Sequence, residues 1–339
     1  MAQKVKLSTI ADSLGLSTAT VSLALRDSPL VAEVTRERIK CAARELGYIY
    51  NRRAASLRTS RSGIVGVCVH DIMNPFFGEI LKSVENELDR QRQTFILCNH
   101  HDDLAKQRSF VDTLLQLGAD GLILSPAIGT PASDIRLPEE NDLPVTLIAR
   151  TVEGSGVLGF RGDDSYGMGL AVDHLVALGH RRIAMIGGTA LTSTGRDREA
   201  GYLAALERAG IEFRPEWRIE GPRNRHSGFD AAATFLQIEN RPTAAACFSD
   251  LVALGFMYGL SRAGLRPGVD IAVTGYDDID EAAIATPPLC TVSNGQSEVG
   301  RRAAEALLAR LAGQPAADET ILITPELRVR QSSDYNWPD

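Results

Sequence analysis

The sequence predicts a protein of two parts, an N-terminal all-α helix-turn-helix head and an α/β core of two doubly wound parallel-sheet subdomains. The first observation is a pair of short helical patterns around a turn within residues 7–26. The second is that, from residue 63 onward, short apolar runs alternate with amphipathic segments, as in parallel sheets covered on both faces. The third is charge: residues 1–61 hold 11 Lys and Arg against 5 Asp and Glu, although the 339-residue chain has a net charge of −7. A basic head on an acidic body favours nucleic-acid binding by the head and a separate task for the body.

Two short helices are predicted in the head, one over about residues 8–14 and one over about residues 18–25. Ser8 is expected to cap the first helix and Ser17 the second, while Gly15 can adopt the left-handed conformation that ends a helix. A second helix with small polar side chains on its outer face fits the major groove of DNA. The side chains expected on that face are Thr18, Ala19 and Ser22.

A third helix is predicted from Thr35, as its N-cap, to Leu46, with Gly47 ending it. A short basic segment follows, in which Leu57 stands among arginines. A lone exposed leucine usually has no special role, but an apolar side chain among arginines can enter a minor-groove base step and open it. A two-helix hairpin could belong to any helical domain, so the third helix and the basic segment are what favour a DNA-binding head.

The core pattern predicts two series of strands and helices that meet near residue 162. The first series has strands at 63–69, 94–98, 121–124 and 144–149, with helices at 77–91 and 104–117. The second has helices at 165–178, 197–209, 227–238 and 250–263, with strands at 183–187, 218–220, 244–248 and 271–274. Ligands of doubly wound sheets bind beyond the carboxyl ends of the strands.

Charged and polar residues and two phenylalanines stand at those predicted strand ends. Carboxylates and guanidinium groups can bond the hydroxyls of a polyol or a small anion, and aromatic faces stack on its C–H surfaces. Each polar residue could instead be solvated or cap the next helix, as Asp250 is well placed to do. The candidate ligand-binding residues are Asp71, Phe76, Phe77, Arg150, Arg198, Arg223, Ser249, Asp250 and Asp277.

Other classes of protein fit the sequence less well. The five cysteines are scattered without a CxxC pair, which indicates buried thiols in a reducing compartment. Residues 100–103, His-His-Asp-Asp, could be imagined as a metal cluster, but solvated loop residues are the simpler explanation. The chain shows no HExxH, phosphate loop or nucleophile elbow, so we expect no enzyme, cofactor or metal. An extracytoplasmic solute receptor would suit the core, but no secretory signal or membrane span is visible, and we expect a cytoplasmic protein.

Several stretches together resemble the LacI/GalR family of bacterial transcription regulators over nearly the whole chain. They include IADSLGLSTATVS, TRERIKCAARELGYIYNRRAASLR, HLVALGHRRIAMIGG, RDREAGY, PTAAACFSD and VTGYDD, in the family's order. The resemblance implies a helix-turn-helix domain over 1–50, a hinge helix and linker over 51–62, and a periplasmic-binding-protein-like core over 63–339. It places one subdomain at about 63–161 and 291–323 and the other at about 162–290 and 324–339. A helix at 296–312 is then expected to return to the first subdomain, so that the chain crosses between the subdomains three times. It further implies a homodimer on a near-palindromic operator, with a small effector in the cleft that changes operator affinity.

The resemblance also implies roles for single residues. Thr18 and Ala19 lie where family members vary the side chains that read bases, and Leu57 matches the minor-groove leucine. Arg198 matches an arginine that grips ligand hydroxyls or carboxylates, and Asp277 matches a ligand-binding acid. The full set of expected DNA contacts is Ser8, Ser17, Thr18, Ala19, Thr20, Ser22, Asn51, Arg52, Ala55 and Leu57.

Three positions depart from the family pattern. Leu23 stands where many members have arginine, so the operator half-site is expected to differ. Ala149 replaces a frequent aspartate, and Arg223 falls where several members have an aromatic residue. The lost acid and the added base predict a positive pocket and an acidic effector, such as a sugar acid or sugar phosphate. No leucine-heptad tail follows residue 333, so we expect a dimer; repressor is the expected role, with activator or corepressor-dependent regulator left open.

Overall fold

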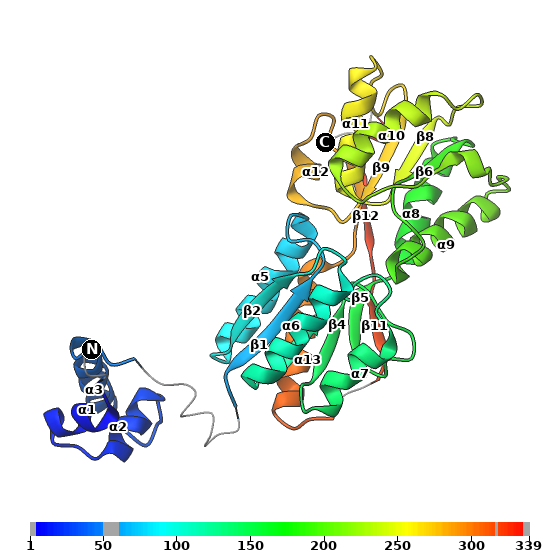
Figure 1. Ribbon diagram of the computed structural model, residues 1–339. Helices are drawn as coiled ribbons and strands as arrows, with labels where there is room; N and C mark the ends of the chain where they lie inside the picture. Colours follow the sequence, from blue (N-terminus) through cyan, green and yellow to red (C-terminus); the bar gives the residue numbers. More distant parts are fainter. Residues whose placement is uncertain (1–4, 50–60, 316–317, 335–339) are drawn as a thin grey trace. The chain divides into compact units, whose positions relative to one another are not determined.

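The computed structural model describes residues 5–49, 61–315 and 318–334, and its contacts divide the chain into two compact units, Met1–Ser62 and Gly63–Asp339. The two units, drawn in Figure 1, are described separately below.

Residues 5–49 of the head unit form three helices around a small apolar core. The core is centred on Ile10, Val21 and Ile39, none of which is accessible to solvent. Gly15 ends the first helix in the left-handed conformation, with a φ of 65°. The Ser17 hydroxyl caps the second helix, because it accepts a hydrogen bond from the Thr20 N–H at 3.0 Å. These features confirm the predicted helix-turn-helix. The three helices are α1 (Leu7–Leu14), α2 (Thr18–Leu25) and α3 (Glu33–Glu45).

Two predicted helix starts in the head are wrong. The N-cap of α1 is Lys6, so Ser8 lies inside the first turn and does not cap the helix. The N-cap of α3 is Ala32, and Thr35 lies inside that helix. Ser, Thr and Asp are favoured N-caps, but a helix can begin without one of them. For this reason the hydroxyl residue nearest to each predicted helix did not mark where the helix begins.

The first subdomain of the core is a six-stranded parallel sheet with helices on both faces. Its strand order is β11-β5-β4-β3-β1-β2. Helices α5 and α13 cover one face and pack on each other, and α6 and α7 lie on the opposite face. The strands are β1 (Ile64–Val69), β2 (Thr94–Asn99), β3 (Gly121–Leu124), β4 (Val145–Ile148), β5 (Gly159–Gly162) and β11 (Thr320–Ile323). The helices are α5 (Pro75–Arg90), α6 (Leu104–Leu117), α7 (Ala132–Glu140) and α13 (Gln296–Leu311).

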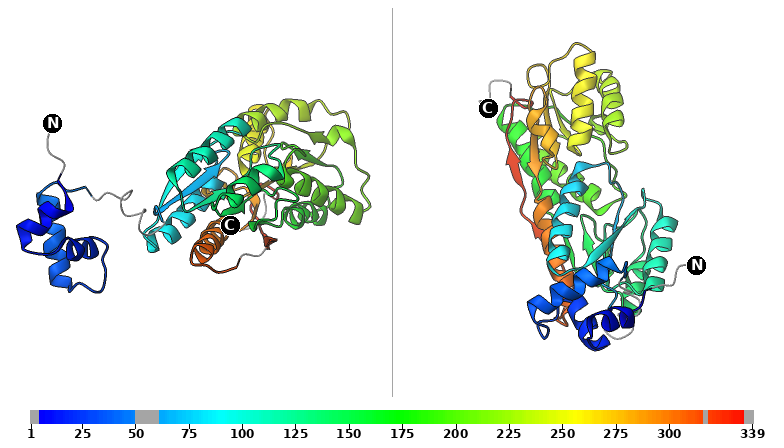
Figure 2. Two further views of the ribbon diagram at one scale, coloured as in Figure 1. Left: turned by 60° about the horizontal axis from the view of Figure 1, so that its bottom comes forward. Right: turned by 90° about the vertical axis from the view of Figure 1, so that its left-hand side faces the viewer.

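The second subdomain repeats this plan. Its strand order is β12-β10-β9-β8-β6-β7, and only β12 runs antiparallel to its neighbour. Figures 1 and 2 show the covering helices, with α10 and α11 on one face and α8 and α9 on the other. The strands are β6 (Ile183–Ile186), β7 (Arg218–Ile219), β8 (Ala244–Cys247), β9 (Ala272–Tyr276), β10 (Cys290–Ser293) and β12 (Glu326–Arg328). The helices are α8 (Asp164–Ala177), α9 (Ser193–Arg208), η1 (Pro215–Trp217), α10 (Arg225–Leu236), α11 (Asp250–Arg262) and α12 (Asp280–Ile284).

The chain passes between the two subdomains three times, as predicted. The crossings follow β5, β10 and β11. Because β10 pairs with β9 and β12, the second crossing comes after Ser293, and the predicted boundary at residues 290/291 is wrong. The prediction also missed α7 and α12, as well as β5, whose Gly-Phe-Arg-Gly sequence has little strand character.

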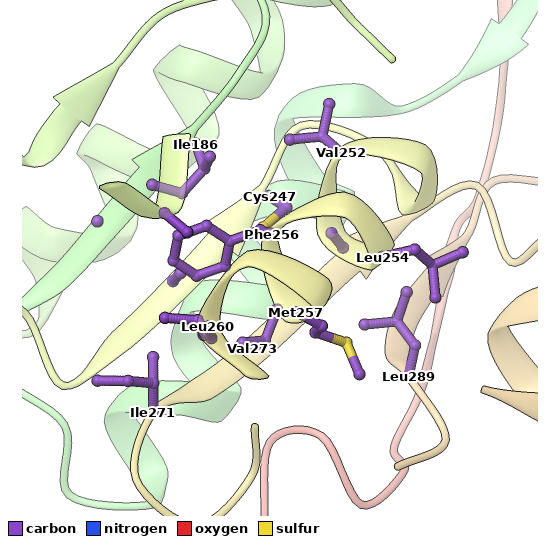
Figure 3. Close-up of a cluster of buried hydrophobic side chains, with 14 of the residues drawn as sticks. Ile186, Cys247, Val252, Leu254, Phe256, Met257, Leu260, Ile271, Val273 and Leu289 are labelled. Carbon is purple, nitrogen blue, oxygen red and sulfur yellow. The ribbon is translucent and has the colours of Figure 1, made fainter. Parts of the chain in front are cut away.

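The apolar core of the second subdomain depends on a very close approach of α10 and α11. Figure 3 shows side chains of this core, among them Phe256 and Leu260 of α11 beside Ile186 and Val273 of the sheet. A Cβ atom on Gly255 would lie 1.9 Å from the Arg225 carbonyl oxygen, so only glycine lets the two backbones meet.

Replacing Gly255 with alanine should therefore lower the free energy of unfolding by about 1–3 kcal/mol, because backbone has to move to make room. Gly78 in α5 is the matched control, since nothing lies within 4 Å of a Cβ built there. Gly78→Ala should raise the free energy of unfolding by about 0.5 kcal/mol, because alanine makes the unfolded chain less flexible. Urea unfolding of both variants measures the difference, and equal changes would contradict the helix contact.

Candidate ligand cleft and DNA-facing helix

A cavity of about 270 Å³ opens at the carboxyl ends of the strands and takes its lining from both subdomains. Its position agrees with the rule for doubly wound sheets. Eight of the nine candidate residues line it: Asp71, Phe76, Phe77, Arg150, Arg198, Arg223, Ser249 and Asp277. Asn74 and Asn224, which the sequence also places at strand ends, line the cavity too, whereas His101, Asp102, Thr194 and Asn294 were not among the candidates.

The ninth candidate, Asp250, does not line the cavity, and that assignment is wrong. Its side chain is completely buried and turned toward the sheet. There it accepts hydrogen bonds from the Thr291 hydroxyl at 2.5 Å and from the Ile279 N–H at 2.9 Å. Burial, together with the nearby charge of Asp277, raises the pKa of Asp250 well above its ordinary value. This carboxyl group therefore joins α11, β10 and the segment before α12.

Arg198 is the centre of the second subdomain's half of the site. Its guanidinium group is 5% exposed and donates to Asp164 at 2.7 Å and to the Phe248 carbonyl oxygen at 2.5 Å. A third nitrogen lies 3.4 Å from Asp277, and the Tyr276 ring stacks at 3.7 Å. Burial acts to lower the pKa of Arg198, but the two carboxylates outweigh it and hold the guanidinium charged. The result is a fixed cation at the cavity wall.

Asp277 occupies a strained position beside this cation. Its φ is 110°, a left-handed value that is costly for any residue but glycine and is typical of ligand sites. Burial raises its pKa to about 7, against the opposing charge of Arg198. The carboxyl group can therefore accept or donate a hydrogen bond near neutral pH.

Because this pKa is higher in the folded than in the unfolded chain, the folded state retains the proton to a higher pH. The contribution of Asp277 to stability is then complete at acid pH and is lost as the pH rises through about 7. We expect the wild type to lose stability relative to Asp277→Asn as the pH rises from the ordinary pKa of 3.8 to about 7, with little further change above that. Urea unfolding of both proteins across that range checks the sign, and parallel pH profiles would contradict it.

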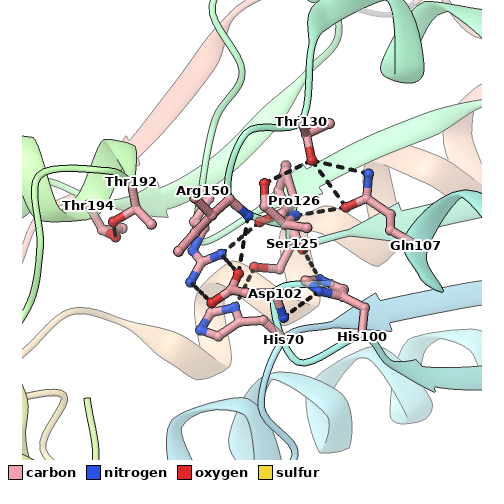
Figure 4. Close-up of polar contacts among 12 residues, drawn as sticks. His70, His100, Asp102, Gln107, Ser125, Pro126, Thr130, Arg150, Thr192 and Thr194 are labelled. Carbon is pink, nitrogen blue, oxygen red and sulfur yellow. Dashed lines mark hydrogen bonds and ion pairs between the residues drawn. The ribbon is translucent and has the colours of Figure 1, made fainter. Parts of the chain in front are cut away.

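A second charged cluster lies on the first subdomain's half, where Asp102 joins two arginines. Asp102 accepts hydrogen bonds from Arg150 at 2.5 and 3.3 Å and from Arg223 at 2.6 Å. Arg150 also donates to the Pro126 carbonyl oxygen at 2.8 Å, and Figure 4 shows this part of the cluster. Burial opposes ionisation of Asp102, but the Arg150 hydrogen bond and the surrounding positive charge hold the pKa of Asp102 well below its usual range.

This cluster corrects two expectations. Residues 100–103 are not all solvated loop residues, because His100 is fully buried with Nε2 2.9 Å from the Ser125 carbonyl oxygen, and Asp102 faces the cavity. Asp102 also offsets part of the positive charge that the sequence predicted for the pocket. The acid absent at residue 149 is supplied from the loop after β2, where Asp102 lies beside Arg150.

His70 and the two phenylalanines form the apolar side of this half. His70 stands edge-on to Phe77, with ring centroids 4.6 Å apart, and Phe76 packs at right angles to Phe77. Burial and the charge of Arg150 lower the pKa of His70 well below its ordinary value, so the ring is neutral. Across the cavity, the Asn294 carbonyl oxygen Oδ1 is buried and has no hydrogen-bond partner among the described residues. It is an acceptor that a bound hydroxyl could satisfy.

In the head, the start of α2 presents the side chains predicted to meet DNA. Ser17, Thr18 and Ala19 are exposed, and Thr20 is half-buried with its hydroxyl 2.8 Å from that of Ser17. Ser22 is 5% exposed, and its hydroxyl has no partner among the residues that the structure describes. The expectation that Ser22 faces DNA is therefore wrong. Ser8 is exposed on α1, and Asn51, Arg52, Ala55 and Leu57 lie outside the described residues.

Two further observations concern residues 5–49, 61–315 and 318–334. Within these ranges, no three His, Cys, Asp or Glu side chains are grouped so that they could hold a metal ion. No helix there has both the length and the apolar character needed to cross a membrane.

Two family models match the chain. The model for bacterial regulatory proteins of the lacI family matches residues 6–51, and that for a periplasmic binding protein-like domain matches residues 172–333. Among curated relatives, the HTH-type transcriptional repressor PurR of Photobacterium profundum is 32% identical over 324 residues, which make up 95% of this chain and 97% of the relative. PurR of Aliivibrio fischeri is 34% identical over 336 residues and covers 95% of this chain and 96% of its own length.

Solved structures give the same picture. The lac repressor dimer bound to operator and the anti-inducer ONPF is similar with a TM-score of 0.86 and 27% identity, over 98% of this chain and 100% of that one. A complex of the transcriptional regulator CelR with cellobiose has a TM-score of 0.73 and 28% identity, over 97% of this chain and all of that one. A regulator from Enterococcus faecium with bound ribose covers 80% of this chain and 98% of its own, with a TM-score of 0.72 and 27% identity.

Proposed function

Because the chain belongs to the LacI family of bacterial transcription regulators and is a DNA-binding repressor, not an enzyme, we propose that it binds a palindromic operator as a homodimer under the control of a small, sugar-like effector. The lac repressor relative is a dimer on operator DNA, which supports the same assembly here. Since operators lie on the chromosome, we place the protein in the cytoplasm.

The observation that supports the effector site best is the composition of the cavity wall. Fixed donors and acceptors from both subdomains face one space of about 270 Å³, at the small end of the range for ligand sites. Arg198 supplies donors, Asp277 supplies an acceptor that can also hold a proton, and Phe76 supplies an apolar face. This mixture suits several hydroxyls on a small carbon frame. Two of the similar structures hold cellobiose or ribose, which supports a sugar-like ligand.

For the DNA contact, we propose that the exposed N-terminal end of α2 enters the major groove. Ser17, Thr18 and Ala19 are accessible there, and Thr20 stands beside them. A helix N-terminus also offers free N–H groups to a phosphate. Ser8 remains a candidate phosphate contact. The roles of Asn51, Arg52, Ala55 and Leu57 stay predictions, with Leu57 as the proposed minor-groove wedge.

The coupling between the two sites follows from the shape of the core. Three chain crossings join the subdomains, so a ligand that binds both walls changes the free-energy balance between their arrangements. An effector shifts operator affinity only through its different affinities for the two arrangements, commonly by about 1–3 kcal/mol.

Selection of bound DNA from a random pool, by the full chain at one fixed salt concentration, tests this proposal. We expect enrichment of one palindrome, with half-sites spaced for a dimer. The selection is repeated with a mixture of sugars, sugar acids and sugar phosphates. Loss of enrichment with the mixture indicates an inducer, and a gain indicates a corepressor. No palindrome under either condition would contradict the proposal.

A further inference from the structure

Two arginines from different subdomains share the carboxylate of Asp102. Arg150 follows β4 in the first subdomain, and Arg223 follows β7 in the second, 121 residues from Asp102 along the chain. Arg150 is 4% exposed, so its charge depends on this partner more than on water. The carboxylate is therefore the common counter-ion of both halves of the cavity.

The position of Asp102 is fixed by its own backbone. Its φ is 61°, and its N–H donates to Nδ1 of His100 at 3.1 Å. Oδ1 of Asp102 accepts hydrogen bonds from the Ile128 N–H at 3.2 Å and from Arg150. Oδ2 accepts one hydrogen bond from Arg150 and one from Arg223. Each carboxylate oxygen thus has two donors, and the carboxylate is close to saturated.

An anionic effector would need the same donors. A carboxylate or phosphate binds best to paired guanidinium groups, and those of Arg150 and Arg223 already face one carboxylate. The remaining charges on the wall do not favour an anion either. Apart from Asp102 and its two arginines, the charged residues of the lining are Arg198, Asp71, Asp164 and Asp277, and the Arg198 guanidinium is already bonded to Asp164 and Asp277.

We infer that Asp102 determines the charge selectivity of the cavity: it occupies the anion position between Arg150 and Arg223, so that the pocket accepts uncharged, hydroxyl-rich effectors and rejects sugar acids and sugar phosphates. This inference rests on the proposed function only in taking the cavity as the effector site. It replaces the acidic effector that the sequence favoured.

The test uses inorganic phosphate as the probe and the thermal midpoint Tm of the full chain as the readout, against chloride at equal ionic strength. Asp102→Gly empties the anion position and suits the left-handed backbone, and Asp102→Asn keeps its shape without the charge. We expect phosphate to raise the Tm of Asp102→Gly by about 2–4 °C. The Tm of the wild type and of Asp102→Asn, whose amide still fills the position, should rise by less than about 1 °C. Asp112→Asn, the same charge change on an exposed part of α6, is the matched control and should behave like the wild type.

Specificity for the two arginines is checked with the double variant Asp102→Gly/Arg223→Gln, which should lose most of the phosphate effect. The inference is overturned if phosphate stabilises the wild type as much as Asp102→Gly, or if Asp102→Gly gains no stability from phosphate. If neither Asp102 variant folds, the wild type still decides: stabilisation by phosphate that Arg223→Gln abolishes would overturn the inference, and its absence would support it. Selection of a palindrome by the wild type is unaffected by these outcomes, so the two proposals fail separately.

Discussion

Replacing Arg198 with alanine should lower the free energy of unfolding by about 3–5 kcal/mol and abolish the response of operator binding to effector. The stability loss follows from burial, because Asp164 and Asp277 lose the only cation that they both contact among the described residues. The loss of response follows from position, because the guanidinium group lies at the cavity wall. Urea unfolding measures the first effect, and a DNA-binding titration with the effector mixture measures the second.

The pH dependence separates this explanation from a simple packing defect. Burial already raises the pKa of both carboxyls in the wild type, and without Arg198 both pKa values should rise further. A raised folded-state pKa gives stability at low pH that is lost as the pH increases, so the variant should be least destabilised in acid. Arg196→Ala, on the exposed side of the same helix, is the control and should change stability by less than about 0.5 kcal/mol. If Arg198→Ala lost the same free energy of unfolding at every pH, the charge argument would be contradicted. If its operator binding still responded to effector, the effector site would have to lie elsewhere.

Replacing Ile39 with alanine should abolish operator binding at 37 °C while leaving the core folded. Ile39 is completely buried among the few core side chains of the head, and its truncation costs about 2–5 kcal/mol. A unit of this size has a small free energy of unfolding, so the cost of the truncation is comparable to the total stability of the head. The α2 surface would then no longer be held for the major groove. Operator titration and a two-step thermal unfolding curve of the full chain test this outcome.

Cys41 on the same helix provides the control for the head. It is exposed, so Cys41→Ala removes a side chain of α3 without opening the core. This variant should bind operator as the wild type does. Operator binding by Ile39→Ala at full strength would show that the head has far more stability than its core indicates.

The parts of the fold that local chemistry determines were predictable from the sequence. Gly15 and Ser17 predicted the turn and the cap of the head, and alternating apolar and amphipathic segments predicted two parallel sheets. The three crossings were predicted from the family resemblance. Ser22 was misplaced because α2 buries the adjacent residues Val21 and Ser22 together, and a strict inside–outside pattern does not anticipate that.

The errors in the site have a different cause, which is contact between distant residues. No spacing rule relates Asp102 to Arg223, since their pairing depends on how two sheets face each other. Asp250 was expected at the cavity because it follows a strand. It turns inward because Gly275 has no side chain: a Cβ there would lie 2.1 Å from Oδ1 of Asp250.

The segment 320–328 supplies β11 to one sheet and β12 to the other, which has a consequence for biosynthesis. On the ribosome, the other strands of the two sheets are translated before it, so β5 and β10 keep open edges until residues 320–328 emerge. Open strand edges invite pairing with other nascent chains. A premature stop near residue 318 would keep all cavity-lining residues and the entire head, yet it would release a product with two unfinished sheets.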